Sequence, residues 1–280
     1  MSSGNETLAS TSALVLLWEG GEIHTSKLSQ HYRKLIDLNS GRKLLAKCNK
    51  VWGHYDQVIK NRKNCILNIV NNVLSNNDMQ QVVLLGAGLD SLSLEIWSHF
   101  NSVRIFEIDI AHMEFKKHIT HEIDPSLSSQ IKYITFDLLF PKELLNSMKN
   151  CGFQRTKPTL IVAEGFSYYM KEKKFWDIIE KFQTPNKQNN IILEYMIPQK
   201  MIAENRAVIP NKIFKIISSE FGIESITHYI KPEIQNKILN LNGKIIANYN
   251  MKQMEKQRTN ENQYFKNDKS GWTEVCHAVI

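Results

Sequence analysis

Short apolar runs alternate with amphipathic segments through the middle of the chain, from residue 81 to residue 196. Five of these runs have the length and composition of buried strands: 82–85, 103–109, 131–136, 159–164 and 191–196. Between them, apolar positions at three-to-four spacing predict helices around 90–100, 111–121, 140–149 and 171–183. Strands that alternate with helices in this way predict a parallel sheet covered by helices on both faces.

The two ends of the chain follow other patterns. The first eighty residues carry apolar positions at helical spacing, with a predicted break at Ser40–Gly41. We expect them to cover the carboxyl ends of the strands, where open α/β sheets bind their ligands. Helical stretches near 211–221 and 231–240 precede apolar segments at 243–251 and 271–280, which predict an antiparallel pair at one sheet edge. The prediction is one α/β domain, with a helical N-terminal cap (1–80) and a ligand-binding core (81–280).

Composition and charge disfavour several classes of protein. The chain has 280 residues, 42% hydrophobic and 22% charged, which is typical of a globular protein. Its net charge is +7, but Lys and Arg are scattered, so we expect no nucleic-acid partner. The apolar run Ala13–Trp18 is too short for a membrane span or a signal peptide. Four widely separated cysteines fit a reducing compartment, so we expect a cytoplasmic protein with no membrane partner.

A glycine turn follows the first strand, in the segment QVVLLGAGLDS. Gly86 and Gly88 would let the backbone approach a nucleotide-like ligand, but a phosphate-binding loop would need a Gly-Lys-Ser/Thr sequence that the turn lacks. A dinucleotide fingerprint would need a third glycine where Ser91 stands, and the acid at Asp90 would oppose a pyrophosphate at the helix N-terminus. These departures favour S-adenosyl-L-methionine, a ribose-bearing ligand that has no phosphate.

Acidic residues at the ends of the next two strands support this cofactor. Asp109 and Glu107 lie on one face of the second strand by alternation, and a carboxylate there would accept hydrogen bonds from both ribose hydroxyls. Asp137 follows the third strand, beside the apolar Leu138, where the adenine amine would lie. The alternative for Asp109 and Asp137 is that each caps the helix that follows it.

Three segments, VVLLGAGLDS, RIFEID and IVAEGFSYYM, together resemble the leucine carboxyl methyltransferase family of S-adenosylmethionine-dependent enzymes, particularly its bacterial small-molecule O-methyltransferases. The resemblance covers roughly residues 50 to 200. It implies a Rossmann-like class I methyltransferase sheet, mostly parallel with an antiparallel C-terminal edge. It also implies that Glu164 faces the ammonium of the cofactor and that Arg62 pairs with its carboxylate, while the cofactor turn, ribose and adenine sites fall to Gly86, Gly88, Asp109, Asp137 and Leu138.

The helix after the glycine turn departs from the family pattern. Bacterial relatives usually continue with Asp-Thr-Arg-x-x-Arg, whereas Leu92 and Glu95 stand here in DSLSLEI where those arginines are expected. The departure removes two positive charges from the start of this helix, and it motivates an alternative in which the chain binds the cofactor without catalysis.

Methyl transfer is an in-line displacement, so the protein mainly positions the acceptor, the methyl group and the sulfur. Tyr168 and Tyr169 follow the Glu164 strand and are candidates to line the acceptor side, where Tyr169 matches the tyrosine usual in the family. A hydroxyl acceptor needs a base, and His54, two helical turns before Arg62, is the candidate. We expect no metal, because the histidines at 112, 118 and 121 do not share a helical face.

The function expected from the sequence is S-adenosyl-L-methionine-dependent O-methylation of a small molecule from secondary metabolism, on a carboxyl or a hydroxyl oxygen. Two alternatives stay open. One is methyl-esterification of a protein C-terminal carboxylate, and the other is a non-catalytic cofactor-binding module. The pattern indicates neither the acceptor nor the oligomeric state.

Overall fold

A seven-stranded sheet forms the centre of the computed structural model, which describes residues 10–76, 78–221 and 225–280. Its order is β3-β2-β1-β4-β5-β7-β6. The strands are β1 (Gln81–Leu85), β2 (Arg104–Asp109), β3 (Ile131–Thr135), β4 (Thr159–Ala163), β5 (Asn190–Met196), β6 (Lys244–Asn250) and β7 (Thr273–Val279). β1 to β5 pair in parallel, and β7 runs antiparallel between β5 and β6. The predicted fold class is confirmed.

The strand order reverses between β1 and β4, because the chain adds β2 and β3 on one side of β1 before β4 joins the other. In open α/β sheets such a switch point opens a crevice at the carboxyl ends of the strands. The register places Leu85 beside Ile108 of β2 and Ala163 of β4, so these three strands end at the same level. The glycine turn therefore begins at the centre of this edge.

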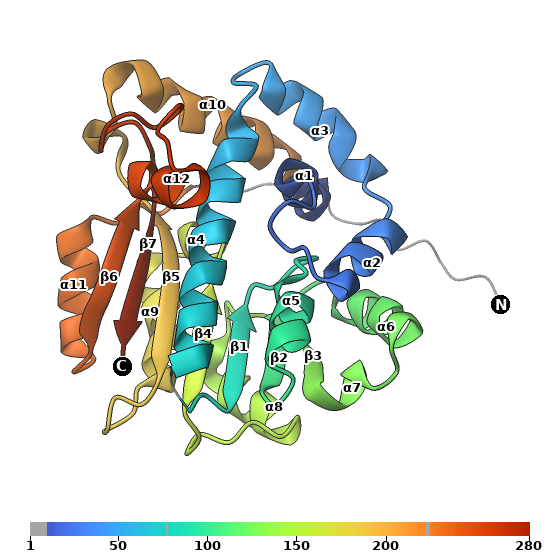
Figure 1. Cartoon of the computed structure of the whole chain (residues 1–280). Helices are drawn as coiled ribbons and strands as arrows, with labels where there is room; N and C mark the ends of the chain where they lie inside the picture. Colours follow the sequence, from blue (N-terminus) through green and yellow to red (C-terminus); the bar gives the residue numbers. More distant parts are fainter. Residues whose placement is uncertain (1–9, 77, 222–224) are drawn as a thin grey trace.

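Helices cover the sheet and its carboxyl edge (Figure 1). The helices of the core are α5 (Leu92–His99), α6 (Met113–Ile123), α7 (Leu127–Gln130), α8 (Leu144–Asn150), α9 (Glu172–Ile179), α10 (Glu204–Phe221), α11 (Lys231–Asn240) and α12 (Met251–Thr259). Before β1 come α1 (Ser10–Glu19), α2 (Lys27–Leu35), α3 (Asn39–Asn49) and α4 (Tyr55–Asn76). Among the helices of the described ranges, none is both long enough and apolar enough to cross a membrane.

The helices before β1 divide into two groups. Figure 1 shows α1, α2 and α3 near the carboxyl ends of the strands, while the long α4 crosses in front of the sheet. α4 contacts β5 and β7, and its buried residues include Val58, Ile66 and Val70. The cap over the crevice therefore consists of α1 to α3, and α4 is part of the sheet's own covering layer.

The predicted helix break at Ser40–Gly41 is wrong, because both residues lie inside α3 and the chain turns before them, at 36–38. Gly41 instead allows α1 and α3 to touch. A Cβ at this position would lie 2.7 Å from the backbone nitrogen of Leu14, closer than real contacts allow. A glycine needed for helix packing was thus interpreted as a helix breaker.

The polar stretch between β6 and β7 contains a helix that its composition did not predict. Asn250 begins α12 by accepting a hydrogen bond from the Gln253 backbone at 3.0 Å, and the Gln253 side chain accepts one from Asn250 N at 2.9 Å. This is a capping box in which Asn and Gln take the usual places of Ser and Glu. Met251 and Met254 of α12 are buried, and the helix packs against α4.

Candidate functional site

Two neighbouring hollows lie at the carboxyl edge of β1, β2 and β4 and share Gly86, Asp109 and Tyr169 in their walls. The first, of about 220 Å³, reaches from the glycine turn to Arg62 and Glu164 and is closed on one side by α1. The second, of about 250 Å³, extends past the end of β3. We call the two together the crevice. Its elongated form suits a ligand with two chemically different ends.

The glycine turn forms the floor of the crevice. Gly86 has φ +66°, and a Cβ there would lie 2.9 Å from the ring of Phe166, so both the backbone conformation and the packing require glycine. Gly86 N and Ala87 N donate to Ile108 O at 2.9 and 3.2 Å, which fixes the turn against β2. Gly88 N donates to the Asp109 carboxylate at 2.9 Å.

Asp109 lies where the sequence predicts a ribose site, at the end of β2 in the wall of both hollows. Each carboxylate oxygen accepts one backbone hydrogen bond, Oδ2 from Gly88 and Oδ1 from Ala111 at 3.1 Å. An ionised carboxylate can accept about four, so capacity remains for two hydroxyls. The capping alternative does not describe Asp109, because the N-cap of α6 is His112.

The second hollow contains the residues predicted for adenine. Asp137 and Leu138 follow β3 and line it together with Phe136 and Met170. Asp137 Oδ1 accepts a hydrogen bond from Leu139 N at 2.8 Å, which holds the loop in a local turn. Apolar walls beside one carboxylate suit a flat, weakly polar ring with an amino group.

Arg62 and Glu164, each predicted to bind the methionine part of the cofactor, meet at the other end of the crevice. Arg62 Nη1 donates to Glu194 Oε1 at 2.9 Å and to the Tyr168 hydroxyl at 3.3 Å. Its Nε is buried 3.4 Å from Glu164 Oε1 and has no hydrogen-bond partner among the described residues. An unsatisfied guanidinium N–H in such a place is a site for a carboxylate ligand.

Glu194 is a site residue that the sequence reasoning missed. It is fully buried in β5, pairs with Arg62, and accepts a hydrogen bond from Gly165 N at 2.6 Å. Burial raises the pKa of Glu194, and Arg62 opposes that shift. The acid in the apolar run IILEYM could have predicted this, because a charge inside a buried strand needs a partner.

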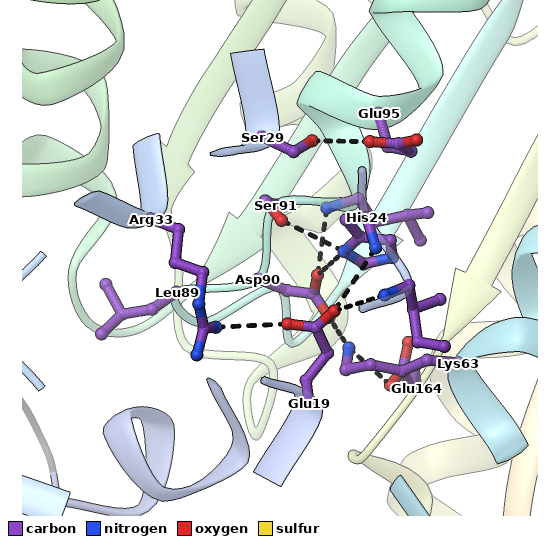
Figure 2. Close-up of polar contacts among 12 residues, drawn as sticks. Glu19, His24, Ser29, Arg33, Lys63, Leu89, Asp90, Ser91, Glu95 and Glu164 are labelled. Atoms are coloured by element: carbon purple, nitrogen blue, oxygen red, sulfur yellow. Dashed lines mark hydrogen bonds and ion pairs between the residues drawn. The ribbon is translucent and has the colours of Figure 1, made fainter. Parts of the chain in front are cut away.

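Lys63 is the second residue that was missed as part of the site. Its side chain is 1% exposed, lines the first hollow, and contacts Asp90 of the glycine turn. Its Nζ also lies 2.9 Å from Glu164 Oε1. Figure 2 shows Lys63 reaching between these two carboxylates. Two positive and three negative side chains therefore line the first hollow: Arg62, Lys63, Asp90, Asp109 and Glu164.

Tyr168 and Tyr169, which the sequence suggests for the acceptor side, both lie at the first hollow. They form the short helix η2 (Ser167–Tyr169), and both line the first hollow opposite α1. Burial raises the pKa of Tyr168 and of Tyr169 well above the usual phenol value. Both phenols therefore stay protonated at neutral pH, and neither acts as a base.

Two predicted residues are not brought to the crevice. His54 is exposed and lies against Tyr264, with ring centroids 4.7 Å apart. Eight residues of helical rise separate it from Arg62 by about 12 Å along the axis. Glu107 is fully buried and pairs with Lys116 of α6, so it does not reach a ligand. The geometry provides no base role for His54 and no ribose role for Glu107.

The segment DSLSLEI, which departs from the family pattern, holds the cap of α1 to α3 against the core. Glu95 accepts hydrogen bonds from Ser26 N at 2.9 Å and from the Ser29 hydroxyl at 2.8 Å, both at the start of α2. His24 Nδ1 lies 3.1 Å from Ser91 Oγ and 3.1 Å from Asp90 Oδ1 (Figure 2). Within the described part of the chain, no group of three or more His, Cys, Asp or Glu side chains could hold a metal ion.

Comparisons with known proteins agree with this geometry. The family model of leucine carboxyl methyltransferase matches residues 28–183. A protein from Mycobacteroides abscessus, assigned as an S-adenosyl-L-methionine-dependent methyltransferase, is 32% identical over 94 residues. That match spans 33% of this chain and 30% of the relative.

Solved structures share the fold at low sequence identity. A protein from Thermobifida fusca assigned as a methyltransferase has a TM-score of 0.68 at 13% identity and covers 98% of this chain and 96% of its own. A DUF574 family protein from Streptomyces avermitilis has a TM-score of 0.67 at 9% identity and covers 96% of each chain. With the matched region, the glycine turn and the strand-end acids in agreement, the chain belongs to the leucine carboxyl methyltransferase family, and its cofactor is S-adenosyl-L-methionine.

Proposed function

We propose that the protein transfers a methyl group from S-adenosyl-L-methionine to an oxygen atom of a small molecule, a carboxyl or a hydroxyl oxygen. The observation that carries the proposal is the closure of the crevice by α1. Thr11, Ser12, Val15 and Leu16 of this helix line the first hollow opposite Tyr168 and Tyr169. An acceptor enclosed between a helix and a pair of phenols is compact, whereas a protein C-terminus would need an open, extended face.

The crevice offers suitable partners for each part of the cofactor. Arg62 would receive the carboxylate, Glu164 the ammonium, Asp109 the ribose, and the hollow beside Asp137 the adenine. The bound cofactor supplies an electrophilic methyl group on a sulfonium sulfur. Transfer of that methyl group to the acceptor oxygen would break the carbon–sulfur bond, leave its electron pair on sulfur and give S-adenosylhomocysteine as the second product.

The residues of this chain mainly orient the acceptor and exclude water. The protonated Tyr169 hydroxyl would donate to a second polar atom of the acceptor, while α1 shields the reacting atoms from solvent. A carboxylate acceptor is already a nucleophile. A hydroxyl acceptor would lose its proton to a carboxylate of the crevice as the new bond forms.

The test uses purified protein, cofactor carrying a deuterated methyl group, and extract of the source organism. Mass spectrometry then searches the small-molecule and the protein fractions for the labelled methyl group. We expect label on a small molecule, with less of it when Asp109→Asn replaces the wild type. Label on a protein would favour carboxyl methylation of a C-terminus, and cofactor binding without any labelled product would favour a non-catalytic module.

A further inference from the structure

Lys63 has no role in the cofactor contacts described above, although it lies in the wall of the crevice beside Arg62. Its side chain is 1% exposed and both of its described ionic partners, Asp90 and Glu164, line the same hollow. Burying an ammonium group is costly unless charged or polar partners surround it. A buried lysine retained in a ligand-binding wall therefore needs an explanation beyond packing.

Asp90 holds this lysine in place. Its Oδ2 contacts Lys63 Nζ, while its Oδ1 accepts the Leu92 backbone N–H at 3.0 Å and lies 3.1 Å from His24 Nδ1. Burial would raise the pKa of Asp90, but Lys63 and His24 outweigh that effect and hold it well below the usual value. Asp90 therefore stays ionised and anchors the ammonium group from the glycine turn.

The donors of the two cations are used differently. Arg62 already donates to Glu194 and Tyr168 through Nη1, which leaves its Nη2 and its buried Nε, the latter 3.4 Å from Glu164 Oε1. Lys63 has three N–H donors and contacts two carboxylates, so it retains capacity for one more acceptor. The methionine end of the cofactor is a zwitterion, whose carboxylate needs cations and whose ammonium needs a free carboxylate oxygen.

We propose that Lys63 is a positioning residue for the methionine end of the cofactor, where its ammonium, anchored by Asp90, donates to the cofactor carboxylate beside Arg62 and orients Glu164 toward the cofactor ammonium. This inference rests on the crevice as the cofactor site. Lys63 also gives Asp90 a positively charged partner in a chain whose helix after the glycine turn lacks the two expected arginines.

The test compares two ligands that differ at this end. S-adenosylhomocysteine carries the amino-acid group, and 5′-methylthioadenosine keeps the adenine, ribose and sulfur without it. Isothermal titration calorimetry of Lys63→Met should show at least a tenfold loss of affinity for S-adenosylhomocysteine, as expected for a lost hydrogen bond between charged groups. Affinity for 5′-methylthioadenosine should stay within about twofold, a selectivity that general loosening of the fold would not produce.

Lys60→Met is the matched control, since it makes the same change one turn earlier in α4. Lys60 Nζ binds Glu22 at 2.7 Å and Asp56 at 3.1 Å, away from the crevice wall, so both ligands should bind as they do to the wild type. Should Lys63→Met fail to fold, Lys63→Met/Asp90→Asn removes the charge pair together and should show the same loss of selectivity.

Two results would overturn the proposal in distinguishable ways. If the wild type binds S-adenosylhomocysteine and the Lys63 variants keep its preference over 5′-methylthioadenosine, the role of Lys63 is wrong and the cofactor site stands. If the wild type binds neither nucleoside, the proposed function falls, and the Lys63 inference falls with it.

Discussion

Replacing Asp109 by Asn tests the ribose site with a minimal change of shape. In the wild type both carboxylate oxygens already hold the backbone, one through Gly88 N at 2.9 Å and the other through Ala111 N at 3.1 Å. Two acceptor positions are then left for the ribose hydroxyls. Asparagine keeps the length and planarity of the side chain but replaces one oxygen by an amino group.

The amide cannot satisfy this arrangement. Whichever way it is turned, its NH₂ group faces the N–H of either Gly88 or Ala111, so one of the two backbone bonds is lost. The remaining contact to the ribose loses its charge assistance, which contributes about 1.5–3 kcal/mol for a hydrogen bond to an ionised group. We therefore expect S-adenosylhomocysteine to bind about 2–3 kcal/mol more weakly, a loss of about 30- to 150-fold.

The assay is isothermal titration calorimetry with S-adenosylhomocysteine, accompanied by thermal unfolding without ligand. Asp124→Asn is the matched control, because Asp124 also accepts a backbone hydrogen bond two residues ahead, from Ser126 N at 2.9 Å, on the exposed end of α6. The control should bind like the wild type. An Asp109→Asn protein that folds and binds within about threefold of the wild type would refute the ribose assignment.

Three further predictions follow from residues away from the reacting atoms. Glu107→Gln should lower the free energy of unfolding by about 3–5 kcal/mol in urea titrations, because Lys116 is left as a buried unpaired charge; the folded fraction should still bind S-adenosylhomocysteine normally. His54→Ala should leave kcat/KM unchanged, since the exposed His54 lies outside the crevice; a tenfold loss would restore it as a base. Burial lowers the pKa of His277 to about 4 from 6.5, so its stabilising contribution is complete above 6.5 and is lost as pH falls toward 4. Unfolding at pH 7 and pH 5 should differ by about 2 kcal/mol from this group, a difference that His277→Gln should remove.

The periodicity of the chain was sufficient to predict the sheet and the position of the crevice. Each strand of the core was predicted within two residues, and the antiparallel edge was expected from the last two apolar runs. These features depend on local patterns of apolar and polar residues, so they can be predicted from the sequence alone. The break at Ser40–Gly41 failed because the reason for Gly41 is the contact of α3 with α1, which no local pattern records.

The structure brings together in one crevice those predicted residues that end a strand or belong to a recognisable segment. Gly86, Gly88, Asp109, Asp137, Leu138 and Glu164 all line the crevice. Glu194 and Lys63 were missed because their importance lies in the pairs Arg62–Glu194 and Lys63–Asp90, whose members are far apart in the sequence. A side chain's partner in such a pair depends on how the elements pack.

Glu107 and His54 show the boundary between the two kinds of information most clearly. Alternation correctly indicates that Glu107 and Asp109 share a face of β2, and helical phase suggests that His54, just before α4, faces the same side as Arg62. Yet Asp109 lies at the open edge of the sheet, whereas Glu107, two residues or about 7 Å earlier in the strand, is buried against Lys116. In the same way, a helical rise of about 12 Å from Arg62 places His54 outside the crevice. The sequence by itself determined the faces of the elements and the succession of strands and helices along the chain. Only the tertiary structure decided how far each residue lies from the crevice, because this distance depends on where the neighbouring strands and helices end.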